Sequence, residues 1–220
     1  MDDGHSAYAS ELFLRIDEEK RERILGIAVE EFATNGYDGA NVNQIAEMAG
    51  ISVGALYKYF ATKEDIFLYI VDVAEATMER QIHEVVDADI RFLSRIERLL
   101  TLAQDYSRSD PSLIKLYSVF TAEHDDARAE LIAEKIEGVT VGAYTKLILD
   151  AQKKGEIRED IDAGILAWLL DNQLVSMQFS FACSYYKKRF SLFIGEQNAR
   201  DNEHVIRSIM QALQSMFGIE

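Results

Sequence analysis

The sequence predicts an all-α protein made of an N-terminal three-helix domain with a helix-turn-helix and a C-terminal helical bundle. Apolar side chains recur at three- and four-residue spacing along almost the whole chain, and no segment shows the alternation of a half-buried strand. Pro111 is the single proline of the 220 residues. The stretch 36–63, GYDGANVNQIAEMAGISVGALYKYFATK, has the layout of two short helices joined by a tight turn. We expect the domains to cover residues 1–62 and 63–220.

The first elements are a short helical turn at 11–16 and a longer helix at about 18–34. Asp17 lies at the N-cap position of the longer helix, where a short carboxylate accepts a hydrogen bond from a free backbone N–H. Gly36 and Gly39 flank Tyr-Asp and are typical of a loop that ends a helix. The chain therefore turns before the helix-turn-helix begins.

The helix-turn-helix shows a start signal and a stop signal for each helix. Asn41 is a good N-cap, and Gln44 lies three residues later in a capping-box arrangement. Gly50 closes this helix, and Ser52 can cap a second short helix at 53–60. The residues expected on the outer face of the second helix are Val53, Gly54, Ala55, Tyr57, Lys58 and Tyr59.

The third helix begins next to a lysine that is suited to a phosphate. Thr62 is the expected N-cap, with Asp65 at the third helical position. Lys63 lies in the first turn, where free backbone N–H groups and a cation favour an anion. Small side chains at Gly54 and Ala55 would also let the preceding helix approach the floor of a DNA groove.

The remaining two thirds of the chain predict further helices. Asp110 followed by Pro111 is a strong start signal, and residues 123–126 predict a polar turn. A loop is expected around Gly195. The helices expected after the helix-turn-helix lie at about 63–86, 90–106, from 111, 127–153, 162–190 and 202–217.

Two segments resemble a known family. IAEMAGISVGALYKYFATKEDIF is similar to the DNA-binding signature of the TetR family of bacterial transcriptional regulators, and RERILGIAVEEFATNGYDGANV resembles the family's first helix. The resemblance covers roughly residues 18 to 70. It implies that Asn43 and the outer face of 53–59 meet base edges. Gln44 is a further DNA-binding candidate, and its side chain is available either to the capping box or to a base edge. It also implies that Tyr57, Tyr59 and Lys63 hold phosphates of a double-stranded DNA operator.

The resemblance further implies a homodimer and a small-molecule effector. In the family, the last two long helices pair with those of a second subunit, and the interior of the second domain binds a ligand. The apolar character of 161–186 favours dimerisation on physical grounds, because a helix that is apolar around most of its circumference needs cover on several sides. It is also compatible with the central helix of a monomeric bundle. Candidate ligand-binding residues are the aromatic side chains Tyr106, Tyr117, Phe120, Trp168 and Phe179, each of which also suits an ordinary core.

The formal net charge of −15 is unusual for a DNA-binding protein. DNA binding needs a local positive surface rather than a positive protein, and an acidic remainder suppresses non-specific binding. The basic residues that can supply a local positive surface are Lys20, Arg21, Arg23, Lys58 and Lys63.

Other kinds of site are not indicated. Cys183 is the single cysteine, the N-terminus lacks the apolar core of a signal peptide, and polar residues interrupt 161–186, so we expect a cytoplasmic protein without a membrane span. The run Glu123 to Asp126 is more typical of a solvated turn than of a metal site. Neither a glycine-rich phosphate loop nor a catalytic pair is apparent, so we expect no cofactor, no metal and no enzyme activity.

These observations predict a ligand-responsive transcriptional regulator, most simply a repressor, that binds a palindromic operator as a dimer. Two alternatives remain open at this point. The chain also fits a helical ligand-binding or adaptor protein whose helix-turn-helix no longer binds DNA. A helical enzyme that uses an apolar pocket is the third reading.

Overall fold

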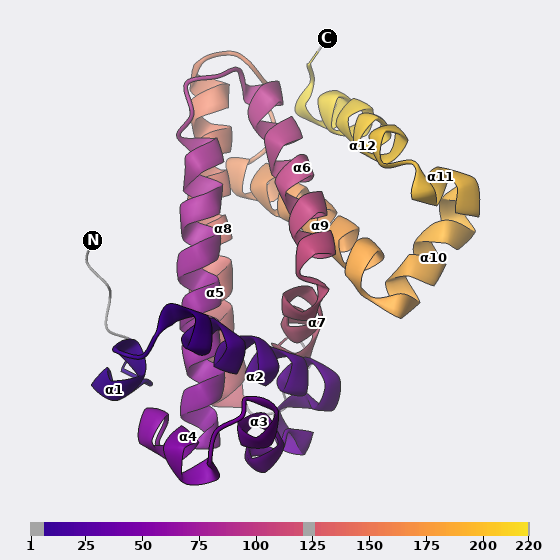
Figure 1. The fold of residues 1–220 in the computed structure, drawn as a ribbon. Helices are drawn as coiled ribbons and strands as arrows, with labels where there is room; N and C mark the ends of the chain where they lie inside the picture. Colours follow the sequence, from indigo (N-terminus) through magenta and orange to yellow (C-terminus); the bar gives the residue numbers. More distant parts are fainter. Residues whose placement is uncertain (1–6, 121–125, 220) are drawn as a thin grey trace. The chain divides into compact units, whose positions relative to one another are not determined.

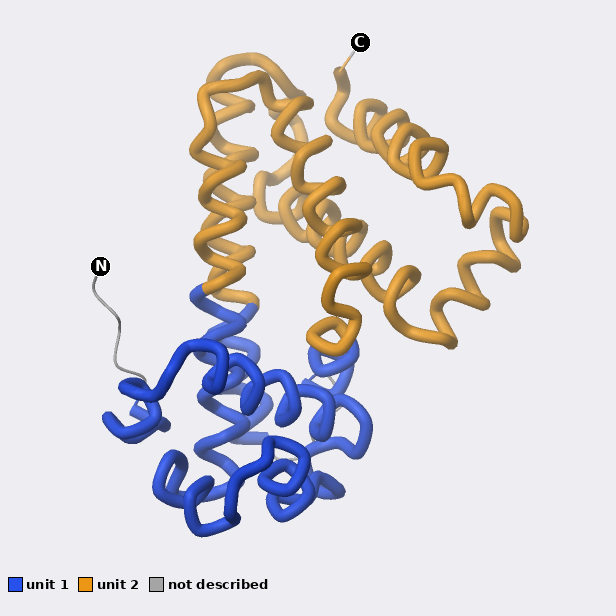
Figure 2. The backbone as a smooth tube through the Cα atoms, viewed as in Figure 1, with its two compact units in different colours: residues 1–76, 115–136 blue, residues 77–114, 137–220 orange. Residues whose placement is uncertain are grey.

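A computed structural model describes residues 7–120 and 126–219, and every regular element within these ranges is an α-helix (Figure 1). The predicted all-α fold class is therefore confirmed. The chain divides into two compact units (Figure 2). Unit 1 comprises residues 1–76 and 115–136, and unit 2 comprises residues 77–114 and 137–220.

Unit 1 contains the helix-turn-helix and parts of three later helices. Its own helices are α1 (Glu11–Leu14), α2 (Glu18–Gly39), α3 (Val42–Met48) and α4 (Val53–Tyr59). It also takes the first part of α5 (Lys63–Val86), the later part of α7 (Pro111–Phe120) and the beginning of α8 (Asp126–Lys153). The fully buried side chains of this unit include Phe13, Ile24, Phe32, Ile45, Leu56 and Phe67.

Unit 2 is a bundle in which α6 packs against α9 and α12, and α9 packs against α10. Its own helices are α6 (Phe92–Ser109), α9 (Ala163–Ala182), α10 (Ser184–Ile194), α11 (Glu196–Arg200) and α12 (Asn202–Phe217). The remaining parts of α5, α7 and α8 complete the unit. Its core is one apolar cluster, in which the rings of Phe92 and Phe217 meet edge to face with centroids 4.9 Å apart.

Several helix limits agree with the local signals in the sequence. The predicted helix at 63–86 is α5, the helix after Asp110 is α7, and the predicted helix at 202–217 is α12. The first long helix extends further than predicted, because α2 continues to Gly39 across a kink at Gly36. Residues 121–125 lie outside the described residues, and so does most of the polar turn predicted at 123–126.

The single helix predicted at 162–190 is wrong. Cys183 has an extended backbone (φ −101°, ψ 129°), which ends α9 at Ala182 and lets α10 begin at Ser184. The break brings the ring of Phe179 to 5.1 Å from that of Tyr186. In a continuous helix these two residues would be about 10 Å apart along the axis. Cys183 keeps both of its backbone hydrogen bonds, because its N–H donates to the carbonyl of Phe179 and its carbonyl accepts from the N–H of Lys187, each at 2.9 Å. The contact between the two rings adds to the packing across this turn.

Candidate DNA-binding site

The turn between α3 and α4 is fixed by backbone hydrogen bonds. Gly50 has a positive φ of 69°, a conformation that favours glycine. Its N–H donates to the carbonyl of Glu47 at 3.0 Å, and the N–H of Ile51 donates to the carbonyl of Ala46 at 3.0 Å. This pair of bonds is a Schellman motif, which satisfies carbonyls that the end of a helix leaves free. Ser52 then caps α4, because its hydroxyl accepts from the N–H of Ala55 at 3.1 Å.

The start of α3 differs from the predicted capping box. The Asn41 side chain does cap the helix, accepting from the N–H of Asn43 at 3.0 Å. The reciprocal partner is not Gln44 but the buried Glu31 of α2, whose Oε1 accepts from the N–H of Asn41 at 2.9 Å. Gln44 is instead exposed. The sequence did contain a signal for this contact, because Glu31 is an acidic residue at a position where the helical periodicity of α2 predicts a buried side chain.

The exposed parts of α3 and α4 form what we call the recognition surface. Asn43 and Gln44 of α3 and Gly54, Tyr57 and Lys58 of α4 are all exposed, and the Tyr57 side chain is 48% exposed. Val53 and Ala55 lie at its edge and are half-buried. A Cβ atom added at Gly54 would meet no atom within 4 Å. The fold itself therefore does not require a glycine there.

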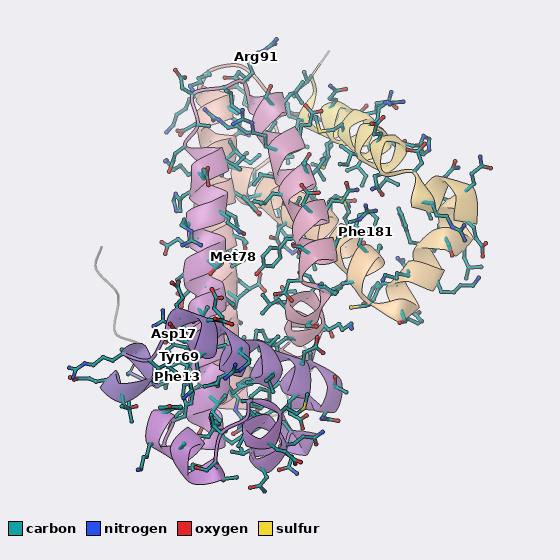
Figure 3. The ribbon with its side chains drawn as sticks, viewed as in Figure 1. Phe13, Asp17, Tyr69, Met78, Arg91 and Phe181 are labelled. Atoms are coloured by element: carbon teal, nitrogen blue, oxygen red, sulfur yellow. The ribbon has the colours of Figure 1, made fainter. Side chains whose placement is uncertain are left out.

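Tyr59 is not on the outer face of α4, as the sequence predicted, but is buried with 7% of its surface exposed. Its ring packs on Phe13 of α1 at a centroid distance of 5.5 Å. Phe13 also meets Phe60 at 4.6 Å and Tyr69 at 5.5 Å, and Figure 3 shows Phe13 and Tyr69 close together. The helical period of 3.6 residues places Tyr59 on a face of α4 that does not contact α3. In the structure α1 packs on this face and buries Tyr59.

The segment before α1 also caps the C-terminal end of α4. The Ser10 hydroxyl donates to the carbonyl of Lys58 at 2.8 Å, and the Ser10 N–H donates to the carbonyl of Tyr59 at 2.9 Å. These carbonyls belong to the last turn of α4, which has no further helical donors. The short α1 segment therefore holds the helix that carries Tyr57 and Lys58.

The ammonium group of Lys63 is hydrogen-bonded within the protein. Its ammonium donates to the carbonyls of Tyr37, Asp38 and Ala40 at 2.7, 3.1 and 3.3 Å, which uses its three N–H groups. The predicted cap of α5 is confirmed, because Thr62 and Asp65 exchange hydrogen bonds of 2.9–3.0 Å. In this structure Lys63 therefore secures the residues that lead into α3.

Two of the other basic residues expected at the DNA surface contact groups within the protein. The Arg21 guanidinium donates to the carbonyl of Leu14 at 3.0 Å, and the Lys20 ammonium lies 5.9 Å from the centroid of the Tyr59 ring. Lys58 and Arg23 are exposed. Arg21 thus helps to hold α1 and Lys20 helps to hold α4, while Lys58 and Arg23 face solvent.

The five candidate ligand-binding aromatics are divided between the units. Tyr117 and Phe120 belong to unit 1, where the Phe120 ring meets Phe67 edge to face at 5.3 Å. The other three belong to unit 2, in which Tyr106 is half-buried, Phe179 is buried and Trp168 is 61% exposed. Burial raises the pKa of Tyr106 to about 12, so this phenol stays neutral at physiological pH.

Unit 2 also holds a half-buried carboxyl that the sequence did not single out. Burial, reinforced by the charge of Glu137, raises the pKa of Asp171 on α9 to about 6. The Thr140 hydroxyl opposes this shift by hydrogen bonding. Burial likewise raises the pKa of the Tyr144 phenol on α8. Among the described residues, no group of three or more side chains could hold a metal ion, and no helix is long and apolar enough to span a membrane.

Comparisons with known proteins agree with this geometry. The profile of the family "Bacterial regulatory proteins, tetR family" matches residues 24–70, which run from α2 into α5 and include both helices of the recognition surface. The chain belongs to the TetR family. It is accordingly a DNA-binding, helix-turn-helix protein of transcription regulation.

Relatives of this TetR-family chain match it over different lengths. The transcriptional regulator QacR of Staphylococcus aureus is 38% identical over 61 residues, which are 28% of this chain and 32% of QacR. The transcriptional repressor SCO4008 of Streptomyces coelicolor is 29% identical over 163 residues, which are 71% of this chain and 77% of the repressor.

The fold is shared over nearly the whole chain. The crystal structure of FadR from Bacillus subtilis in complex with stearoyl-CoA superposes with a TM-score of 0.68 at 18% identity, covering 87% of this chain and 96% of FadR. At this identity the likeness shows the fold alone. The shared fold includes the helical bundle as well as the DNA-binding helices.

Proposed function

We propose that this protein is a homodimeric transcriptional repressor that binds a palindromic DNA operator and is released by a small-molecule effector. It would act on DNA in the cytoplasm. The observation that carries the DNA-binding part is the recognition surface, which combines exposed polar, aromatic and basic side chains with an exposed glycine. Two such surfaces related by a twofold axis would address half-sites about 34–36 Å apart, or a multiple of that distance.

Each residue of the recognition surface has a proposed role. Asn43 and Gln44 read base edges, because amide side chains donate and accept hydrogen bonds in the major groove. Val53, Gly54 and Ala55 allow α4 to approach the groove floor. Tyr57 and Lys58 contact phosphates, which position the protein without reading sequence.

Tyr59 and Lys63 receive indirect roles. Tyr59 is packed on Phe13, and the Lys63 ammonium is bonded to three backbone carbonyls. We therefore assign both residues to the support of the recognition surface rather than to the primary phosphate contacts. Their substitution would weaken DNA binding by disturbing α3 and α4.

The homodimer is proposed to form through α9 and α12, with a contribution from α10. On α9, Ile165 and Trp168 are 52% and 61% exposed. On α10, Tyr185, Leu192 and Phe193 are 73–77% exposed. A second copy of the chain would remove this apolar area from water, which favours association.

Effector binding is proposed to occur in unit 2. The support is the shared fold with FadR, which was solved with stearoyl-CoA. Among the candidate aromatics, Tyr106 and Phe179 lie within this unit and are at least half-buried. By linkage, an effector weakens operator binding only as far as it binds the non-binding conformation more tightly.

The decisive experiment selects DNA from a pool of random duplexes at low salt and compares three proteins. Gly54→Leu places a bulky side chain on the recognition surface where the fold leaves open space. Gly26→Leu is the matched control, because Gly26 is also exposed, helical and free of atoms within 4 Å of an added Cβ. Wild type and Gly26→Leu should enrich the same palindrome, and Gly54→Leu should lose it while remaining folded.

The alternative function is a ligand-binding or adaptor protein that does not bind DNA. Its support is the net charge of −15. This alternative predicts that a folded, dimeric wild-type protein enriches no duplex, and that Tyr57→Ala and Lys58→Ala leave every activity unchanged. Either finding would contradict the proposed repressor function.

A further inference from the structure

The ring of Tyr37 lies where α2, α5 and α8 meet within unit 1. Its plane is nearly parallel to that of Phe32, with centroids 6.1 Å apart, and Phe67 meets it edge-on at 5.0 Å. Two cations approach the same ring. The Arg128 guanidinium carbon is 3.9 Å from the ring centroid, and the Lys63 ammonium is 4.8 Å from it. Both distances are within the range of cation–π attraction.

Arg128 comes from the beginning of α8, which is remote in sequence from the helix-turn-helix. Its side chain is 14% exposed, and its Nε lies 3.5 Å from the carboxylate of Glu64 in the first turn of α5. A guanidinium can stack flat on an aromatic ring and direct its edge to a carboxylate at the same time. Arg128 thus connects α8 to Tyr37 and to the start of α5.

Tyr37 belongs to the short segment that delivers the chain to α3. Gly36 breaks the regular geometry of α2 with a φ of 70°, and α3 starts after Asn41. Between these points, Lys63 holds the carbonyls of residues 37, 38 and 40, and Glu31 holds the N–H of Asn41. The position of residues 37–40 therefore sets the position of α3.

We propose that Arg128 is a positioning residue for DNA recognition, which acts from α8 by holding the ring of Tyr37 and with it residues 37–40. This inference rests on the proposed DNA-binding function. It assigns to α8 a direct role in ordering the recognition surface. The same helix continues through residues 137–153 into unit 2. A displacement of α8 would therefore act on α3 through the contact between Arg128 and Tyr37.

The test measures backbone amide hydrogen exchange of residues 37–48 and affinity for the selected duplex. Arg128→Ala should speed exchange in this segment roughly three- to tenfold, which corresponds to the loss of one partly buried cation–π contact. It should weaken duplex binding by a similar factor. Arg128→Lys keeps the charge but not the flat guanidinium, so an intermediate effect is expected.

The matched control is Lys135→Ala. Lys135 is another cation of α8 in unit 1, and it contacts Asp72 and Glu75 of α5 at 3.0 and 2.9 Å rather than the Tyr37 ring. Its loss should leave the exchange of residues 37–48 unchanged. Equal effects of Lys135→Ala and Arg128→Ala would overturn the proposal, because Arg128 would then merely help to dock α8.

A double-mutant cycle with Tyr37→Leu tests the contact itself. In the Tyr37→Leu background, Arg128→Ala should have little further effect on exchange or affinity. Independent, additive effects would contradict the proposal. Because exchange is measured without DNA, this result stands apart from the duplex selection. A wild-type protein that binds no duplex would refute the proposed function, whereas unchanged exchange in Arg128→Ala would refute the role of Arg128.

Discussion

The carboxylate of Glu31 accepts a hydrogen bond from the backbone N–H of Asn41 at 2.9 Å. Glu31 is 6% exposed, so this contact ties the core-facing side of α2 to the first residue of the helix-turn-helix. Glu31→Ala leaves the N–H without its acceptor, and we expect a loss of about 1–3 kcal/mol in the free energy of unfolding. Glu31→Gln keeps an acceptor oxygen and should lose less. Urea unfolding of the two variants measures the difference, and equal losses would contradict this account.

Gly36 is predicted to be intolerant of substitution because of its backbone. Its φ of 70° is combined with a ψ of 176°, a conformation open to glycine and strained for other residues. Gly36→Ala should lower the free energy of unfolding by about 1–3 kcal/mol although a Cβ there meets no atom within 4 Å. Gly26→Ala is the control within the same helix and should raise stability by up to about 1 kcal/mol. Thermal melting of both variants checks the opposite signs.

Phe13 should contribute far more to stability than its place in a four-residue helix suggests. The ring is fully buried against Tyr59, Phe60 and Tyr69. We expect Phe13→Ala to lower the free energy of unfolding by about 3–5 kcal/mol. Leu12→Ala changes the neighbouring residue, which is 52% exposed, and should stay within about 0.5 kcal/mol of wild type. A small effect of Phe13→Ala in denaturant unfolding would show that α1 does not support α4.

Asp171 is predicted to make stability depend on pH. Burial raises its pKa to about 6 from an ordinary value of 3.8, so the folded state binds this proton more tightly than the unfolded state. The contribution of this protonated carboxyl to the free energy of unfolding is present at low pH and is lost as pH rises from about 4 to 6. Asp171→Asn removes the buried charge and should stabilise the protein at pH 7 by on the order of 2 kcal/mol. That gain should vanish near pH 4 in unfolding experiments, and a gain independent of pH would contradict the assignment.

Trp168 is predicted to be important for dimerisation. Its side chain is 61% exposed on α9, and tryptophan side chains that become buried at an interface often contribute 2 kcal/mol or more. Trp168→Ser should raise the dimer dissociation constant at least about tenfold in sedimentation equilibrium. Leu12→Ser replaces an exposed apolar residue of unit 1 and should leave the dimer dissociation constant unchanged. A Trp168→Ser protein that dimerises like wild type would exclude this face of α9 from the interface.

Local signals in the sequence predicted much of the fold. Thr62 with Asp65 located the start of α5, and Asp110 with Pro111 located the start of α7. A glycine at position 50 indicated the turn between α3 and α4. These signals suffice because helix caps and backbone preferences involve residues only a few positions apart.

The candidate site was predictable only in part. The exposed positions Asn43, Gln44, Gly54, Tyr57 and Lys58 follow from helical periodicity and from the resemblance to the TetR family. Tyr59 was placed on the wrong side because periodicity within α4 carries no information on α1. The break at Cys183 was missed because the apolar periodicity continues across it, whereas in the structure the rings of Phe179 and Tyr186 on either side of it meet at 5.1 Å.

The sequence by itself determined the helical fold, the helix-turn-helix and the residue types of the recognition surface. The tertiary structure decided which of these residues are available to DNA and which are held by the protein. Lys63 is bonded to a carbonyl 26 residues away, and Ser10 to one 48 residues away. Such contacts depend on how helices pack, and packing brings together residues whose sequence positions give no sign of their proximity.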